Sequence, residues 1–110
     1  MAKKKSAFDR VPPRAVSVEQ LNAQAVALLQ QGQFQAGADL LSQSLAQNPR
    51  QSETYYNFGI ALHQLGLLDS AIQAYGQAIA LAPDDVDALM SRGVVLAMQQ
   101  RFEEAARDFS

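Results

Sequence analysis

From residue 17 onward, apolar residues recur every three or four positions, which is the period of an amphipathic α-helix. Leu21, Ala25 and Leu28 form the first such stripe, and Ser17 followed by Gln20 is the signature of a capping box at its start. Later stripes predict helices over residues 34–48, 52–65 and 68–82, then a fifth that Asp85 caps and a sixth that begins near residue 101. The pattern therefore predicts an all-α fold.

Glycine and proline residues divide these predicted helices into pairs. Gly32 and Gly66 lie in the turns inside the first two pairs, and Gln100 takes their place in the third. Pro49 and Pro83 follow the second and fourth helices, and the residue before a proline is disfavoured in the helical conformation. Each pair therefore reads as helix, turn, helix and stop.

The chain repeats itself with a period of 34 residues. Positions 34 apart share their size class, and large positions alternate with small ones as close helix packing requires. The large classes are Leu21, Tyr55 and Leu89; Leu28, Leu62 and Leu96; and Leu41, Tyr75 and Phe109. The small classes are Ala25, Gly59 and Gly93; and Gly37, Ala71 and Ala105. A period of this length indicates a stacked helical array.

These recurring positions resemble the tetratricopeptide repeat family. The middle copy carries the family pattern as Tyr55, Phe58-Gly59, Leu62, Ala71, Tyr75, Ala78 and Pro83, and the resemblance covers residues 18–110. It implies an α-solenoid of stacked antiparallel helix pairs in a right-handed superhelix, with repeats at 18–51 and 52–85 and an incomplete one at 86–110. Gln24 and Arg92 replace Phe58 in the other copies, so we expect both to be less buried.

Composition and charge narrow the class of protein. The 110 residues suffice for one domain, are 48% hydrophobic, and include no cysteine, so disulfides and thiolate metal sites are excluded. No apolar run reaches the length of a membrane-spanning helix, and we expect no membrane association and a cytoplasmic location. Residues 1–16 carry a charge of about +4 and the remainder about −6.

Residues 1–16 are predicted to form a flexible basic tail ahead of a repeat domain at 17–110. Lys3, Lys4 and Lys5 precede Pro12 and Pro13, and the segment has too little apolar area to repay ordering. One interpretation is an arm that binds nucleic acid or an anionic membrane. The other is a solvated leader, which we favour because three lysines without an aromatic neighbour make a weak basic patch.

Residues that could perform catalysis are sparse. His63 is the only histidine, there is no glycine-rich phosphate loop, and the adjacent carboxylates Asp84-Asp85 and Glu103-Glu104 do not face one another on a helix. We therefore predict that this chain is not an enzyme and needs no cofactor or metal.

The resemblance implies a binding surface instead. In tetratricopeptide repeat proteins the first helix of each pair lines a concave groove that holds a partner peptide. The matching residues here are Glu19, Asn22, Val26, Glu53, Tyr56, Asn57, Ile60, His63, Asp87, Met90, Val94 and Met98. They include an apolar strip (Val26, Ile60, Val94) and an acidic strip (Glu19, Glu53, Asp87), although carboxylates are also favoured in the first turn of any helix.

The partner follows from these charges. One subclass of the family grips a carboxylate terminus with basic residues, but at the matching positions Asn22, Val26, Asn57, Asp87 and Ser91 only Asn57 fits. We therefore predict a protein-interaction scaffold for a basic or apolar peptide, not a carboxylate-clamp chaperone adaptor. The alternative is a leader of a larger bacterial glycosyltransferase, methyltransferase or sulfotransferase. Nucleic-acid binding is disfavoured by the acidic body.

The sixth helix stops after about two turns, which we expect to leave part of the apolar surface without cover. The residues affected are Leu89, Leu96, Phe102, Ala105 and Phe109. Two outcomes follow for this end. Either a longer protein continues the array, which we favour because the break falls inside a helix, or another copy covers the end by self-association.

Overall fold

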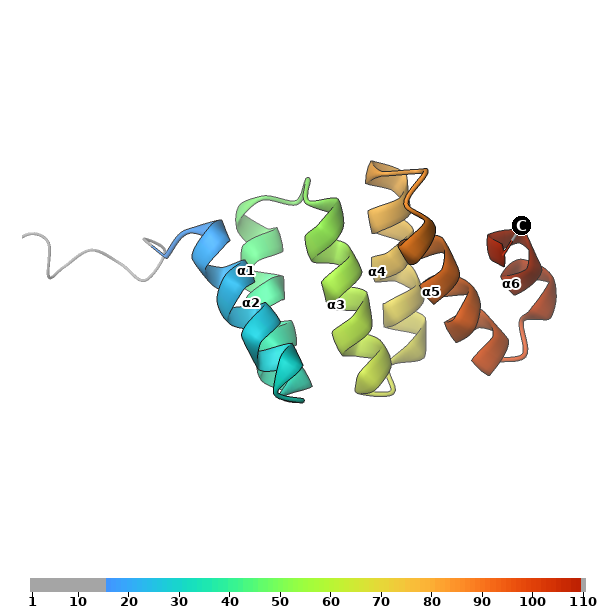
Figure 1. Cartoon of the computed structure of the whole chain (residues 1–110), viewed down its shortest axis with the longest axis horizontal. Helices are drawn as coiled ribbons and strands as arrows, with labels where there is room; N and C mark the ends of the chain where they lie inside the picture. Colours follow the sequence, from blue (N-terminus) through green and yellow to red (C-terminus); the bar gives the residue numbers. More distant parts are fainter. Residues whose placement is uncertain (1–15, 110) are drawn as a thin grey trace, which may run out of the picture.

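The structure, a computed structural model, describes residues 16–109 and contains six α-helices and no strand in that range. The helices are α1 (Val18–Gln30), α2 (Phe34–Gln47), α3 (Ser52–Gln64), α4 (Leu68–Leu81), α5 (Val86–Met98) and α6 (Phe102–Phe109). Figure 1 shows them as a row of neighbours that alternate in direction. The all-α prediction is confirmed, and the predicted boundaries agree within one residue. Apart from Val16, the predicted basic tail lies outside the described residues.

Local sequence accounts for the helix starts. At α1 the Gln20 backbone N–H donates to Ser17 Oγ at 3.1 Å, and the Ser17 backbone N–H donates to Gln20 Oε1 at 3.0 Å, which completes the predicted capping box. At α5 the Ala88 backbone N–H donates to Asp85 Oδ1 at 3.2 Å. These bonds satisfy backbone donors that the first helical turn leaves without a partner.

The turns inside the three helix pairs share one geometry. Gly32 and Gly66 have φ values of 78° and 80°, and Gln100 takes the third place with a φ of 60°. In each turn the next N–H donates back across the helix end, as from Gln33 to the Leu28 carbonyl at 2.9 Å. Gln100 therefore holds a left-handed conformation that costs a non-glycine residue about 1 kcal/mol.

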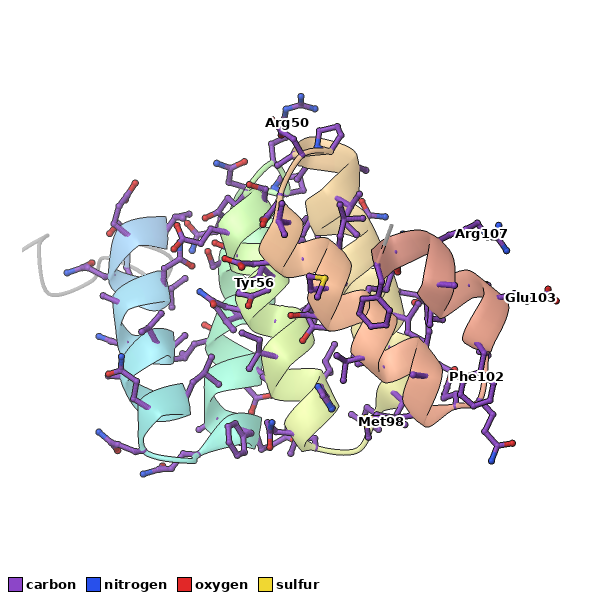
Figure 2. The ribbon with its side chains drawn as sticks, turned by 45° about the vertical axis from the view of Figure 1, so that its right-hand side comes forward. Arg50, Tyr56, Met98, Phe102, Glu103 and Arg107 are labelled. Atoms are coloured by element: carbon purple, nitrogen blue, oxygen red, sulfur yellow. The ribbon has the colours of Figure 1, made fainter. Side chains whose placement is uncertain are left out.

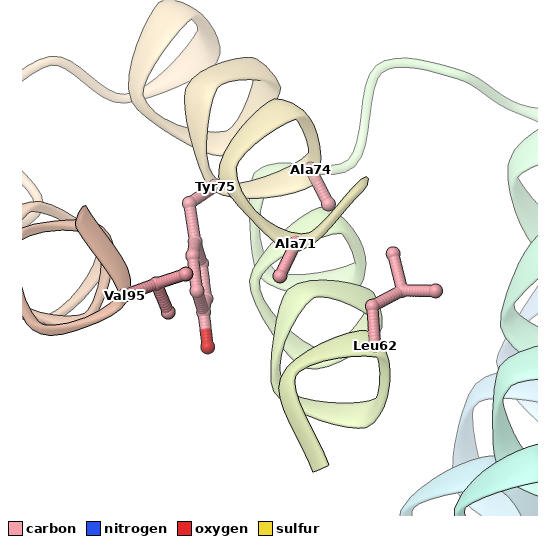
Figure 3. Close-up of a cluster of buried hydrophobic side chains, with 5 residues drawn as sticks. All are labelled: Leu62, Ala71, Ala74, Tyr75 and Val95. Atoms are coloured by element: carbon pink, nitrogen blue, oxygen red, sulfur yellow. The ribbon is translucent and has the colours of Figure 1, made fainter. Parts of the chain in front are cut away.

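The core lies between the helices along the whole row. In its middle, Leu62, Ala71, Ala74, Tyr75 and Val95 form one buried cluster, drawn in Figure 3. Tyr75 is 1% exposed, and its ring fills the space that Gly59 leaves open on α3. The predicted alternation of large and small positions is what lets this aromatic ring pass between α3 and α5.

Each helix contacts chiefly its neighbours along the chain, and a much smaller contact joins α1 to α3. The first helices of the pairs, α1, α3 and α5, run in the same direction, so they all begin along one long edge of the row, the upper edge in Figure 1. The second helices, α2, α4 and α6, begin along the opposite edge. This arrangement places the start of every first helix along one edge of the molecule.

Candidate functional site

The twelve residues predicted to line the groove all lie on α1, α3 and α5, and we call the surface they form the first-helix face. Three apolar members are clearly exposed: Met90 and Val94 at 45% and Met98 at 54%. Val26 and Ile60 are half-buried, and Ile60 packs against the central cluster. Figure 2 shows Tyr56 on α3 and Met98 on α5. The apolar part of this face is therefore most open on α5.

The acidic strip consists of Glu19, Glu53 and Asp87, each exposed and each in the first turn of its helix. The carboxylates face the positive ends of the helix dipoles, which stabilises them without any ligand. Their exposure also leaves them free to meet a positively charged group.

Asn22, one of the predicted groove residues, also makes a contact within the protein that the sequence did not indicate. Its Nδ2 donates to Gln51 Oε1 at 2.8 Å, and its Oδ1 is buried without a hydrogen-bond partner among the described residues. Gln51 also accepts from Thr54 Oγ1 at 2.9 Å and donates to the Asn48 carbonyl at 2.7 Å. Gln51 thus ties α1 and α3 to the end of α2, and Asn22 contributes to holding the first two repeats together.

Tyr75 reaches from α4 toward the first-helix face. Its ring lies 5.9 Å from that of Tyr56, at an interplanar angle of 47°, and its hydroxyl forms a hydrogen bond with the Ser91 side chain on α5. Burial raises the pKa of Tyr75 to about 12; the nearby Tyr56 also raises this pKa, and the bond with Ser91 opposes the change. The repeat register indicates that position 75 takes a large side chain, but it does not indicate which group the tyrosine hydroxyl contacts.

An ion pair joins α5 to α6. Arg92 Nε and Nη2 donate to the two carboxylate oxygens of Asp108, each at 2.7 Å, and the Asp108 side chain is only 7% exposed. The hydrogen bond with Asp108 raises the pKa of Arg92 above its ordinary value. Gln24 is exposed as predicted, whereas Arg92 is half-buried because it makes this pair.

The hollows described on the surface lie away from the first-helix face. One lies between α3 and α4, and another lies around the Arg92–Asp108 pair. The first is lined by Tyr55, Phe58, Leu62, Ser70, Gln73, Ala74 and Gln77. None of the twelve predicted residues borders these two hollows.

Within residues 16–109, no helix combines the length and hydropathy needed to cross a membrane. No three histidine or acidic side chains in the same range gather where they would hold a metal ion. Stacked helix pairs with an open face on their first helices define the class of helical repeat proteins.

Comparison with known proteins gives the family. Residues 22–80 and 56–110 match the tetratricopeptide repeat family, and the chain belongs to it. Tetratricopeptide repeat protein 16 of Macaca fascicularis is 34% identical over 85 residues, which is 77% of this chain and 10% of that protein. The UDP-N-acetylglucosamine–peptide N-acetylglucosaminyltransferase of Giardia intestinalis is 40% identical over 62 residues, which is 56% of this chain and 4% of the enzyme. The chain thus spans a tenth or less of these relatives.

Solved structures share the fold. The crystal structure of MamA superposes with a TM-score of 0.83 at 28% identity, covering 86% of this chain and 55% of that one. The second tetratricopeptide domain of Spaghetti (RPAP3), bound to the HSP90 peptide SRMEEVD, gives a TM-score of 0.81 at 17% identity, covering 84% and 86% of the two chains. The all-α solenoid is confirmed, and proteins of this fold are generally non-catalytic scaffolds for protein or peptide partners.

Proposed function

We propose that this chain is an interaction scaffold whose first-helix face binds a partner peptide with basic and apolar residues. The observation that carries the proposal is the register of Glu19, Glu53 and Asp87, all exposed at one edge, beside the exposed Met90 and Val94. Carboxylates attract a cationic ligand and set its orientation, while apolar contacts supply affinity. Methionine side chains adapt to varied apolar groups.

The same charges argue against an acidic ligand. The RPAP3 domain holds the peptide SRMEEVD, which carries two glutamates and a terminal aspartate. In this chain the corresponding edge is itself acidic, and like charges brought together at an interface are unfavourable. A partner of that kind is therefore not the one we propose here, which agrees with the absence of the clamp's basic residues at Val26 and Asp87.

A peptide-binding measurement tests the proposal. We expect fluorescence anisotropy to show binding of a labelled peptide that alternates lysine with leucine, weakening steeply with salt, and no comparable binding of SRMEEVD. The triple variant E19Q/E53Q/D87Q should weaken the basic peptide at least about tenfold and flatten its salt dependence. Preference for the acidic peptide, or an unchanged affinity in the triple variant, would refute the proposed site.

A second candidate function rests on the match to the Giardia glycosyltransferase. In that enzyme the matched region is only 4% of the length, so the repeat segment is a small part of a much longer protein. In that case the scaffold described here presents a partner or substrate protein to a catalytic domain elsewhere. Sequencing the gene beyond codon 110 distinguishes the two, because this candidate requires a catalytic domain in the same reading frame.

A further inference from the structure

Negative charge is concentrated along the edge of the row where α1, α3 and α5 begin. The first turns of these helices and the loops before α3 and α5 carry five carboxylates and one guanidinium, a net charge of −4. The groups are Glu19, Glu53, Asp84, Asp85, Asp87 and Arg50. Figure 2 shows Arg50 at this edge of the row.

The segment of the same chain that precedes this edge has the opposite charge. Residues 1–15 carry five basic groups and one acid, a net charge of +4, and contain every lysine in the sequence. They also contain Phe8 and Val11 between the basic positions. The segment therefore combines cationic and apolar groups, which is the composition that the first-helix face is proposed to bind.

The segment joins the described chain at the acidic edge itself. Val16 precedes α1, and its carbonyl accepts a hydrogen bond from Gln47 Nε2 at 3.3 Å, so the junction lies beside the end of α2. Packed helices lie about 8–10 Å apart, so the edge from α1 to α5 is a few such steps long. Fifteen extended residues span about 50 Å, which is enough to follow the whole edge.

We propose that residues 1–15 lie along the acidic edge of the first-helix face of their own chain, with their basic groups on its carboxylates. This inference rests on the proposed function of that face. An external partner then has to displace the segment, which makes the chain its own competitor. The apparent affinity for a partner falls by the fraction of molecules in which the face is free.

A spin label on the segment tests its location. Because the chain lacks cysteine, Ala2→Cys accepts a nitroxide at one place only. In ¹⁵N spectra of the full chain at low salt, we expect amide broadening concentrated in the first turns of α3 and α5, which are distant from residue 2 in sequence. About 0.5 M salt should largely abolish it, since the screening length then falls well below 10 Å.

Two triple variants identify the partner charges. E19Q/E53Q/D87Q should remove the broadening. D39N/D69N/E103Q removes the same number of charges from the second helices, away from the acidic edge, and should leave the broadening unchanged. Equal loss in both variants, or broadening confined to α1, would overturn the inference. A sample that mixes labelled ¹⁴N chains with unlabelled ¹⁵N chains should show no effect; broadening there would make a second copy the occupant and refute the assignment to the same chain.

A binding measurement separates this inference from the function on which it rests. Replacing Lys3, Lys4, Lys5, Arg10 and Arg14 with glutamine should tighten binding of the lysine–leucine peptide at least about threefold. Peptide binding that the tail substitutions do not change refutes the intrachain ligand and leaves the proposed function intact. Failure of both the full chain and the tail variant to bind refutes the proposed function itself.

Discussion

Gly59 and Gly76 both lie inside helices, yet the space beside them differs. A Cβ added at Gly59 would lie 2.6 Å from Tyr75 Cε1, whereas one added at Gly76 would meet nothing closer than Arg92 Nη1 at 3.7 Å. We expect Gly76→Ala to raise the free energy of unfolding by about 0.5–1 kcal/mol, because alanine is the better helix former. Gly59→Ala should lower it by about 1–3 kcal/mol through overpacking.

Urea unfolding followed by circular dichroism measures both changes. The pair is matched, since each variant adds one methyl group to a helix. If Gly59→Ala stabilised the chain as much as Gly76→Ala does, the close approach of the Tyr75 ring to α3 would be wrong.

The Tyr75 hydroxyl gives the protein a dependence on alkaline pH. Its pKa is about 12 in the folded chain and 10 in an unfolded one, so between these values the folded state keeps a proton that the unfolded state has lost. Stability is therefore complete below pH 10 and falls as the pH rises toward 12. Tyr75→Phe should remove this part of the loss, which unfolding curves at pH 9 and pH 11 would reveal. An equal loss in both proteins would exclude Tyr75 as its source.

The register of the sequence predicts residue size and burial better than it predicts polar partners. The 34-residue period assigned Tyr75 to a recurring large position and Gly59 to a recurring small one, and the structure shows that these two positions are in contact. The bonds of Gln51 and Ser91 could not be predicted in this way. They depend on rotamers and on the distance between helices, and neither is a property of the repeat pattern.

At the scale of the element, α6 packs against α5, and two of its contacts there are specific. Arg92 binds Asp108 through two bonds, and the Phe109 ring lies against Gly93, where an added Cβ would be 2.7 Å from Phe109 Cε1. With eight residues, α6 is too short to persist as an isolated helix. Its order therefore comes from packing on α5.

Arg92→Gln should release α6 without unfolding the remainder. It leaves the Asp108 carboxylate, which is largely buried, without its charged partner, and that is costly. We expect hydrogen exchange to accelerate at least about tenfold over residues 102–109 and to change little in α3 and α4. Arg101→Gln is the control, because Arg101 pairs with Glu104 on the exposed surface. Equal acceleration in both variants would show that the Arg92–Asp108 pair does not hold α6.

The helices themselves were predictable because each carries its own boundaries. Ser17, Asp85, the turn glycines and the prolines are local signals, and all of them coincide with helix ends in the structure. The ion pair of Arg92 was not foreseen. The family pattern places an apolar residue there, and only the presence of Asp108 opposite it makes the substitution favourable.

At the scale of the whole molecule, the row ends in an apolar surface on α6. Phe102 is 63% exposed and Phe109 is 45% exposed, while Leu96 and Ala105 beneath them are buried. Of the residues predicted to lack cover, the two phenylalanines are therefore exposed, whereas Leu96 and Ala105 are buried. Such a surface favours contact with a further apolar group.

We expect the isolated chain to self-associate at high concentration through this end. Phe102→Ser should reduce the weight-average mass measured by sedimentation equilibrium. Val86→Ser is the matched control, since Val86 is 64% exposed but lies at the start of α5. A strictly monomeric parent chain, or an equal effect of the two substitutions, would refute this role of α6.

Because each helix is held chiefly by its neighbours in the row, the molecule lacks a central core that would lock distant helices together. Small rotations at each of the helix boundaries add up along the row, so its ends can twist against each other while every local contact is preserved. The resistance of the solenoid to twisting then depends on side chains that link neighbouring helices, such as Tyr75 and Gln51. A ligand that contacts both α1 and α5 would favour one degree of superhelical twist. Tighter packing around Tyr75 would then restrict the range of ligands that fit.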